Sequence, residues 1–222
     1  GATVLRQRAR EAEDAADLEY LLEHLPQAIG LSLEGLDRVA RIVRSMKEFA
    51  HADEAAMSAI DINRAIESTL IVARHEYRYV AEVHLDFAEL PPVTCNGGEI
   101  NQAVLNVVVN AAHAIADRRR GTDCLGHIHI RTRRERDAVV ISIADDGGGI
   151  PEDRQTKIFD PFFTTKPVGS GTGLGLYLAF GIVRKHGGDI QVESKPGKGT
   201  IFRIQLPHQP ALEPVRYQQN QH

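Results

Sequence analysis

Several residue types are scarce in this chain of 222 residues, and each scarcity excludes some classes of protein. Tryptophan is absent, and cysteine occurs only twice, as Cys95 and Cys124. The two cysteines lie far apart in the sequence and outside any metal-ligand spacing, so neither a disulfide framework nor a cysteine-based zinc site is expected. We therefore expect a reducing, cytoplasmic compartment.

A surplus of one charge sign and long hydrophobic runs are also missing. The 26 Lys and Arg residues and 30 Asp and Glu residues give a formal net charge of −4, which argues against nucleic acid as a partner. Apolar runs stop well short of the roughly 20 residues that a membrane span needs, so we expect no membrane contact by this chain. Because it opens on Gly1 without an initiator Met, we expect the natural protein to extend upstream, with or without a membrane anchor.

The first part of the chain has a helical pattern, within a composition of 42% hydrophobic residues. From Leu18 to Met46 apolar residues recur at steps of three and four, which predicts amphipathic helix. Pro26 either lies in the first turn of a second helix or kinks a continuous one. Because one hairpin cannot bury its own apolar stripe, we expect residues 1–53 to belong to a dimerising four-helix bundle; a helix packed on its own domain is the alternative.

After this segment, helices alternate with strands, which predicts a second domain over residues 54–207 and a disordered tail over 208–222. We expect an α+β fold in which helices cover one face of a sheet. The expected helices span residues 61–77, 98–119 and 173–186, and the expected strands span 83–87, 128–132, 139–144, 190–193 and 200–206.

The helix expected at 98–119 carries Asn106, Asn110 and His113 on one face, opposite an apolar face that packs on the sheet. An asparagine oxygen is a neutral hard ligand, suited to a Mg²⁺ ion that already holds phosphate oxygens and waters. On these residues alone, a solvated polar face is the simpler interpretation.

The segment Asp145-Asp-Gly-Gly-Gly-Ile150 ends a predicted buried strand with three glycines. Glycines let the backbone approach a ligand where a Cβ atom would clash. A carboxylate at the end of the strand can accept a hydrogen bond from an exocyclic amine such as that of adenine. A plain Asp-Gly turn is the alternative interpretation.

A second glycine-rich segment, Gly169-Ser-Gly-Thr-Gly-Leu-Gly-Leu176, runs directly into a predicted helix. Backbone N–H groups at a helix N-terminus bind phosphate, whereas the alternative, a flexible linker, rarely runs into an apolar helix. Between the two glycine segments, Ile158–Lys166 holds three phenylalanines. We expect them to be exposed in a mobile lid over residues 151–171, with Lys166 reaching a terminal phosphate.

These segments follow the order of the N, G1, F, G2 and G3 boxes, and the chain is similar to sensor histidine kinases, within the superfamily that also holds gyrase, Hsp90 and MutL. The matching motifs are Asn106-x-x-x-Asn110-Ala, Asp145-x-Gly-x-Gly-Ile150, Phe159-x-Pro-Phe-Phe, Gly171-x-Gly-Leu-Gly-Leu176 and Gly197-x-Gly-Thr200. Residues 36–49 also resemble the second helix of the family's dimerisation and histidine-phosphotransfer domain.

The resemblance implies an α/β sandwich with a mixed sheet under three helices, and a site for ATP and Mg²⁺. Asn110 would ligate the metal, with Asn106 and His113 near the phosphates. Asp145 would hold the adenine amine with support from Thr200. The other nucleotide contacts that the resemblance implies are Gly147, Gly149, Ile150, Phe159, Thr165, Lys166, Gly171, Thr172, Gly173, Leu174, Gly175 and Leu176.

One position bears on the type of chemistry. ATP-hydrolysing members of the superfamily carry a glutamate one turn before the metal asparagine, and Asn106 stands there in this chain. An amide has no basic site to take a proton from water, so phosphoryl transfer is favoured over hydrolysis. We therefore expect a protein-histidine kinase whose catalytic residues are Asn106, Asn110 and Lys166; a hydrolytic ATPase is the weaker alternative.

The family's phosphoacceptor pattern, a histidine followed by an acid and then a proline, is missing. His24 lacks the acid, and His51 lies at the far end of the second helix. We therefore expect the catalytic portion of a sensor kinase without its acceptor, dimeric through the hairpin and serving a response regulator. The rival interpretation is a non-catalytic nucleotide-binding and dimerisation module. His127 and His129 lack a third metal ligand in the sequence and are interpreted as surface residues.

Overall fold

The computed structural model describes residues 57–122, 124–166 and 172–208, and a set of helical residues near the N-terminus. That set is Val4, Arg6, Tyr20, Leu22, residues 24–30, Ser32, Leu33 and Leu36. The chain divides into two compact units, one built on the N-terminal residues and the other on most of the rest.

In the N-terminal unit, residues 24–30 are helical without interruption. Pro26 therefore lies within a helical stretch of the described residues. The rings of Tyr20 and His24 stack one helical turn apart, with centroids separated by 4.0 Å. The apolar side chains of Leu22, Leu25, Ile29, Leu33 and Leu36 are all at least half exposed. The second half of the predicted hairpin lies outside the described residues, and none of the described helices combines the length and the apolar character needed to cross a membrane.

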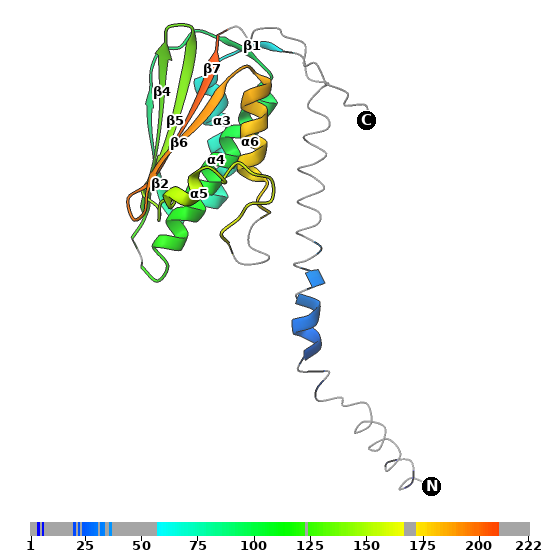
Figure 1. The fold of residues 1–222 in the computed structure, drawn as a ribbon. Helices are drawn as coiled ribbons and strands as arrows, with labels where there is room; N and C mark the ends of the chain where they lie inside the picture. The colour runs from blue at the N-terminus through cyan, green and yellow to red at the C-terminus, as the bar shows by residue number, and fades with distance from the viewer. Residues whose placement is uncertain are drawn as a thin grey trace, which may run out of the picture. The chain divides into compact units, whose positions relative to one another are not determined.

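The second unit is built on a five-stranded mixed sheet in the order β2-β4-β5-β7-β6 (Figure 1). Its strands are β2 (Ala81–Phe87), β4 (Gly126–Glu135), β5 (Ala138–Asp145), β6 (Asp189–Lys195) and β7 (Gly199–Pro207). β2 runs parallel to β4, and every other neighbouring pair is antiparallel. The five predicted strands are thus all observed, each somewhat longer than predicted.

Helices α3 (Ile62–Tyr77), α4 (Gly97–Arg118) and α6 (Gly175–Lys185) cover one face of this sheet (Figure 1). Along β4, buried and exposed residues alternate, with Ile128 and Ile130 buried towards the helices. The largest fully buried side chains include Phe202, Ile141, Ile143 and Ile204 of the central strands. A mixed sheet under three helices is the fold that the resemblance implied, and it is confirmed.

Side-chain caps explain where two of the helices begin. Asp61 accepts a hydrogen bond from the amide of Arg64 at 3.2 Å and caps α3, as its position before an apolar pattern predicted. Asn96 accepts from the amides of Gly98 and Glu99 and caps α4 in the same way. The Asn96 cap fixes the start of α4, the helix that carries Asn106.

A buried polar cluster joins the start of α4 to the end of α6. His186 is 2% exposed, and its Nδ1 lies 2.8 Å from the carbonyl oxygen of Ile182. Its Nε2 accepts the backbone N–H of Asn96 at 3.0 Å, which fixes Nδ1 as the protonated nitrogen. Lys185 donates to the buried carboxylate of Glu99 at 3.0 Å. The two helices that carry the candidate site are therefore held together at the end of α6.

Three short elements were not predicted: β1 (Ser58–Ile60), β3 (Val93–Cys95) and α5 (Glu152–Gln155). β1 and β3 pair with each other in a separate two-stranded sheet. Pro207 is the last residue of β7, and the amide of His208 donates to the carbonyl of Asp137 at 2.9 Å. His208 therefore belongs to the fold, although the sequence analysis placed it in the tail; residues 209–222 lie outside the described part of the chain.

Candidate functional site

Asp145 is the last residue of β5 and is almost fully buried, at 9% exposed. Burial raises the pKa of its carboxyl group to about 6, against hydrogen bonds from the amides of Gly147 and Thr200, which lower it. The Gly147 amide lies 2.8 Å from the Asp145 Oδ1 atom. The sheet places Thr200 directly opposite Asp145 in the β5–β7 ladder. The carboxylate is thus fixed by the backbone, as an adenine acceptor needs to be.

Glycines are required around Asp145 because other parts of the chain come too close for a side chain. A Cβ atom on Gly147 would lie 2.7 Å from the Asp145 Oδ1 atom and 2.8 Å from Ala114 of α4. On Gly149, which has φ of +73°, it would lie 2.1 Å from the carbonyl oxygen of Lys195. The sequence predicted that a ligand approaches the backbone closely at these glycines. In the structure, the atoms that lie this close to Gly147 and Gly149 belong to the protein itself.

The neighbouring carboxylate, Asp146, has a structural role. Its Oδ2 atom is 2.6 Å from the guanidinium of Arg119, and its Oδ1 accepts the amide of His127 at 3.0 Å. Although partial burial acts in the opposite direction, these contacts hold the pKa of Asp146 below its usual range. Arg118 donates to the backbone carbonyls of Asp146 and Gly147. The end of α4 thus fixes the backbone that follows Asp145.

Ser194 and Gln155 complete the support of this segment, and sequence reasoning missed both. The Ser194 hydroxyl lies 2.9 Å from the Thr200 hydroxyl and accepts the Ile150 amide at 2.8 Å. Gln155 donates from its side chain to the carbonyls of Ile150 and Ser194. No sequence motif marks these two residues, because they meet only when α5 packs against β6.

Asn106 and Gly175 come together between α4 and α6. A Cβ atom on Gly175 would lie 3.8 Å from the Asn106 side chain, so the start of α6 faces this asparagine. Asn106 Oδ1 accepts from Gln102, while its buried Nδ2 has no hydrogen-bond partner among the described residues. No described side chain caps α6, whose first position follows Leu174. This combination leaves a buried donor and a helix N-terminus side by side, which suits an anion.

The other two predicted site residues of α4, Asn110 and His113, have different surroundings. Asn110 lies one turn after Asn106 and is half-buried. His113 points towards α3, where its Nε2 lies 3.7 Å from a carboxylate oxygen of Glu76.

The phenylalanine segment differs from the expected exposed cluster. Phe159 packs against Phe180 of α6 and Phe202 of β7, with ring centroids 5.3 and 6.4 Å away, and Phe163 is also packed on the core. Only Phe162 is largely exposed, at 64%. Its backbone approaches Gly173 so closely that a Cβ atom there would lie 2.4 Å away. The prediction of three exposed phenylalanines is wrong, because two of them complete the core beneath the segment.

Six further predicted contacts near this segment have different outcomes. Leu174 is buried and Leu176 packs on the core, while Thr165 is exposed. Gly171 lies outside the described residues. Lys166 and Thr172 belong to the other compact unit, so their nucleotide contacts remain predictions.

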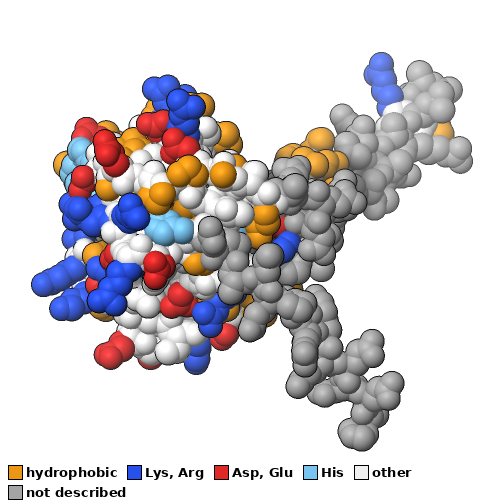
Figure 2. Space-filling model, turned by 90° about the horizontal axis from the view of Figure 1, so that it is seen from above, with side chains coloured by type: hydrophobic (Ala, Val, Ile, Leu, Met, Phe, Trp, Pro, Cys, Tyr) orange, Lys and Arg blue, Asp and Glu red, His pale blue; other side chains and the backbone are white. Residues whose placement is uncertain are grey.

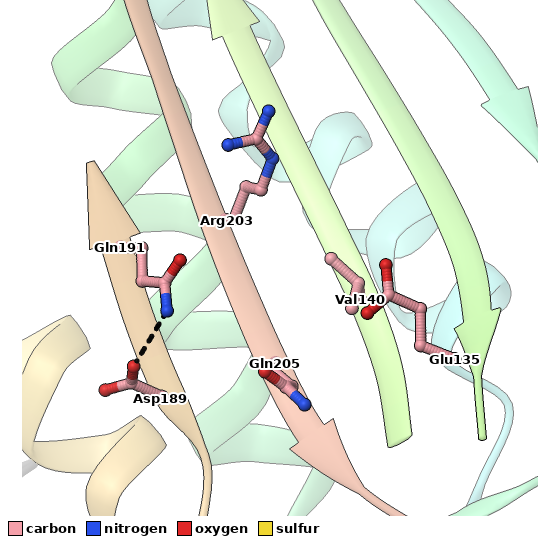
Figure 3. A pocket seen from close by; sticks show the side chains of 6 residues that line it. All are labelled: Glu135, Val140, Asp189, Gln191, Arg203 and Gln205. Atoms are coloured by element: carbon pink, nitrogen blue, oxygen red, sulfur yellow. Dashed lines mark hydrogen bonds between the residues drawn. The ribbon is translucent and has the colours of Figure 1, made fainter. Parts of the chain in front are cut away.

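A shallow hollow on the open face of the sheet is separate from this site (Figure 3). Its lining comes from β4, β5, β6 and β7: Glu135, Val140, Asp189, Gln191, Arg203 and Gln205. Gln191 donates to Asp189 along β6 at 3.3 Å. It contains none of the glycines or asparagines of the site. Figure 2 shows basic and acidic side chains intermixed over the face seen from above, which accords with the small net charge.

A sequence model of the family described as histidine kinase-, DNA gyrase B- and HSP90-like ATPase matches residues 96–210, just over half of the chain. The chain belongs to this ATPase family. The match begins at the cap of α4 and covers Asp145, both glycine segments and Thr200. Nucleotide binding is therefore a property of this domain.

Curated relatives of the ATPase domain are sensor kinases. Signal transduction histidine-protein kinase AtoS of Escherichia coli K12 is 34% identical over 213 residues, which are 93% of this chain and 31% of AtoS. Sensor kinase CckA of Brucella abortus is 34% identical over 183 residues, 78% of this chain and 19% of CckA. The chain thus spans about a third or less of the length of these relatives.

Solved structures of the same fold include the mycobacterial sensor histidine kinase MprB, at 27% identity and a TM-score of 0.58, covering 70% of this chain and 100% of that one. The catalytic domain of histidine kinase ThkA matches at 29% identity and a TM-score of 0.60, covering 69% of this chain and 97% of its own. The ATPase domain is thus the catalytic domain of a sensor histidine kinase, as the resemblance in the sequence indicated.

Proposed function

We propose that this domain binds ATP with Mg²⁺ and that the natural protein transfers the γ-phosphate to a histidine, for relay to an aspartate of a response regulator. Asp145 carries this proposal: it is a buried carboxylate fixed by two backbone amides at the end of a strand, in a chain of the ATPase family. A group held in that state is suited to accept the exocyclic amine of adenine.

The proposed roles follow the positions of the residues. Asp145 accepts the adenine amine, and the Thr200 amide holds the Asp145 carboxylate in place. Asn110 supplies an oxygen to Mg²⁺, and the unpaired Nδ2 of Asn106 donates to a phosphate oxygen. The start of α6 at Gly175 receives the phosphates. Bound Mg²⁺ would neutralise the phosphate charge that develops during transfer.

Asn106 also favours transfer over hydrolysis. It stands one turn before Asn110 on α4, the place at which a hydrolytic enzyme needs a base. Its amide can orient a phosphate but cannot accept a proton from water. We propose on this ground that ATP is consumed only when an acceptor side chain is docked, with Lys166 near the terminal phosphate.

The N-terminal helix supplies the proposed dimer contact. Five leucine and isoleucine side chains between Leu22 and Leu36 are exposed at helical spacing. A second copy of the chain would cover such a stripe, as in a helical bundle. The alternative function, a non-catalytic module for nucleotide binding and assembly, would use the same stripe.

Nucleotide affinity is expected to depend on pH through Asp145. Its pKa in the folded domain is about 6, so acidification below that value protonates the carboxyl and removes the charged acceptor. Affinity for ADP should fall by about tenfold per pH unit below the pKa and level off above it. Calorimetric titration at several pH values measures this. The phosphates of ADP titrate in the same range, so the Asp145→Asn variant, which lacks the titrating carboxyl, serves as the reference. Identical pH profiles for the variant and the unmodified chain would contradict the assignment of Asp145 as the adenine acceptor.

The chain by itself is expected to bind ATP without phosphorylating itself. Transfer requires an imidazole nitrogen in line with the γ-phosphate and oriented by a neighbouring acid. Neither His24 nor His51 has the sequence pattern of such an acceptor. Incubation with γ-labelled ATP and Mg²⁺ should therefore leave no acid-labile label on the protein.

Addition of a separate helical domain that carries the family's His-acid-Pro acceptor pattern distinguishes the two candidate functions. Label on the acceptor domain supports the kinase, and its absence, with ATP binding intact, supports the non-catalytic module. Stoichiometric acid-labile label on the chain alone would show that it contains an unusual acceptor.

A further inference from the structure

A compact group of histidines lies outside the nucleotide site, on the exposed face of β2 and β4. The two strands are parallel, with Glu82 opposite His127 and His84 opposite His129. All four side chains are exposed, while the residues between them on β4 are buried towards the helices. Residues two apart on a strand share a face, so the register brings the four together. The sequence shows two separate pairs, Glu82 with His84 and His127 with His129, because more than 40 positions lie between the pairs.

The ligand atoms are already spaced as a metal ion requires. One ligand atom from each of Glu82, His84 and His127 lies within 4.8 Å of the others. The Nε2 of His84 is 3.2 Å from the Nδ1 of His127 and 3.9 Å from the Oε2 of Glu82. A tetrahedral Zn²⁺ ion with ligands at about 2.0–2.1 Å sets two nitrogens about 3.3–3.4 Å apart. The nitrogen pair matches this spacing, and the exposed Glu82 side chain needs only a small movement.

We propose that Glu82, His84 and His127 bind a divalent transition-metal ion, for which Zn²⁺ is the best match. Two imidazoles and one carboxylate are ordinary zinc ligands and leave a fourth position for water. Mg²⁺ and Ca²⁺ prefer oxygen-only sites and would not select this set. Without metal, one imidazole donates a hydrogen bond to the other. When the metal is bound, the Nε2 of His84 and the Nδ1 of His127 both donate lone pairs to it, so each ring carries its proton on its other nitrogen.

The surroundings support the ligands in two ways. The ring of His129 stacks on that of His84 with centroids 4.7 Å apart and an interplanar angle of 17°, which limits rotation of the ligand ring. Two residues beyond His129, Arg131 is paired with Asp86 at 2.6 Å, and the same carboxylate lies 3.5 Å from Arg133, so the positive charge near the metal is compensated in part. The site lies on the sheet face that the helices leave open, so metal binding does not require the proposed kinase function.

The test is calorimetric titration of ZnCl₂ into chelator-treated, nucleotide-free protein. Every sample carries Cys124→Ser, because an exposed thiol binds zinc by itself. One Zn²⁺ per chain is expected. His84→Gln and His127→Gln should each weaken binding by about tenfold or more, since even outer-shell changes cost 10- to 100-fold. His75→Gln, an exposed histidine of α3 outside the group, is the matched control and should bind as before.

Thermal unfolding gives a second measurement on the same proteins. Zinc should raise the Tm of the Cys124→Ser chain and of the His75→Gln control, but not the Tm of the two ligand variants. In EDTA the ligand variants should have the same Tm as the Cys124→Ser chain, because the substituted side chains are exposed. The proposal is overturned if the Cys124→Ser chain binds no zinc, or if both ligand variants retain its affinity.

Discussion

Replacement of Asp145 by asparagine is expected to weaken nucleotide binding by about 1.5–3 kcal/mol, or roughly 10- to 150-fold. The amide keeps the shape and one acceptor oxygen but loses the charge that strengthens a hydrogen bond from the adenine amine. Calorimetric titration with ADP at neutral pH measures the loss directly.

The same variant separates binding from stability. The pKa of Asp145 in the folded domain is about 6, above its ordinary value, so the ionised carboxylate destabilises the free domain increasingly as pH rises towards and through 6. Asparagine removes that cost. The nucleotide-free variant should therefore be at least as stable as the unmodified chain at neutral pH, so a loss of affinity cannot come from unfolding.

Asp146→Asn is the matched control for this experiment. Its carboxylate is already paired with Arg119 and accepts the His127 amide. The substitution should lower the free energy of unfolding and leave ADP affinity nearly unchanged. Equal affinity of the Asp145→Asn variant and the unmodified chain would rule out Asp145 as the adenine acceptor.

The second large effect is expected for Gly199→Ala, at the first residue of β7, directly after the turn from β6. Gly199 has φ of +98°, and a Cβ atom there would lie 1.9 Å from the carbonyl oxygen of Asp145. The backbone of β5 would have to move at the residue that carries the carboxylate. We expect a loss of about 3 kcal/mol or more in the free energy of unfolding, measured by chemical denaturation, together with weaker ADP binding.

The same turn contains the control. Gly197 also has a positive φ, of +74°, but a Cβ atom there would meet nothing within 4 Å. Gly197→Ala should therefore cost only the backbone strain, about 1 kcal/mol, and leave ADP affinity intact. Equal losses of unfolding free energy and of ADP affinity in the two variants would show that the close approach of Gly199 to Asp145 does not matter.

The parts of the fold that depend on local pattern could be predicted from the sequence. Asp61 before an apolar helical repeat marked the start of α3, and the alternating residues of β4 and β5 marked two central strands. β1 and β3 could not be found in this way, because three residues carry no period and their partners lie far along the chain. Their pairing depends on tertiary structure alone.

The candidate site likewise contains some residues that the local sequence reveals and others that only the folded structure brings together. The Asp145 loop and Asn106 could be proposed from the sequence because their residue types suit a ligand. Ser194 was missed because its contacts with Ile150 and Thr200 exist only after β6 and β7 form their hairpin. Phe159 was assigned to an exposed lid because its segment lies between two glycine-rich segments. In the fold it packs against Phe180 and Phe202.

The parallel pairing of β2 with β4 has a consequence for the order of folding. β4, β5, β6 and β7 pair as antiparallel neighbours, and two of these pairs are joined by tight turns that close quickly. β2 pairs across the whole of α4, with His84 and His127 separated by 43 positions, so a long loop must close before this ladder forms. We therefore expect the edge that holds the histidine group to assemble after the two hairpins.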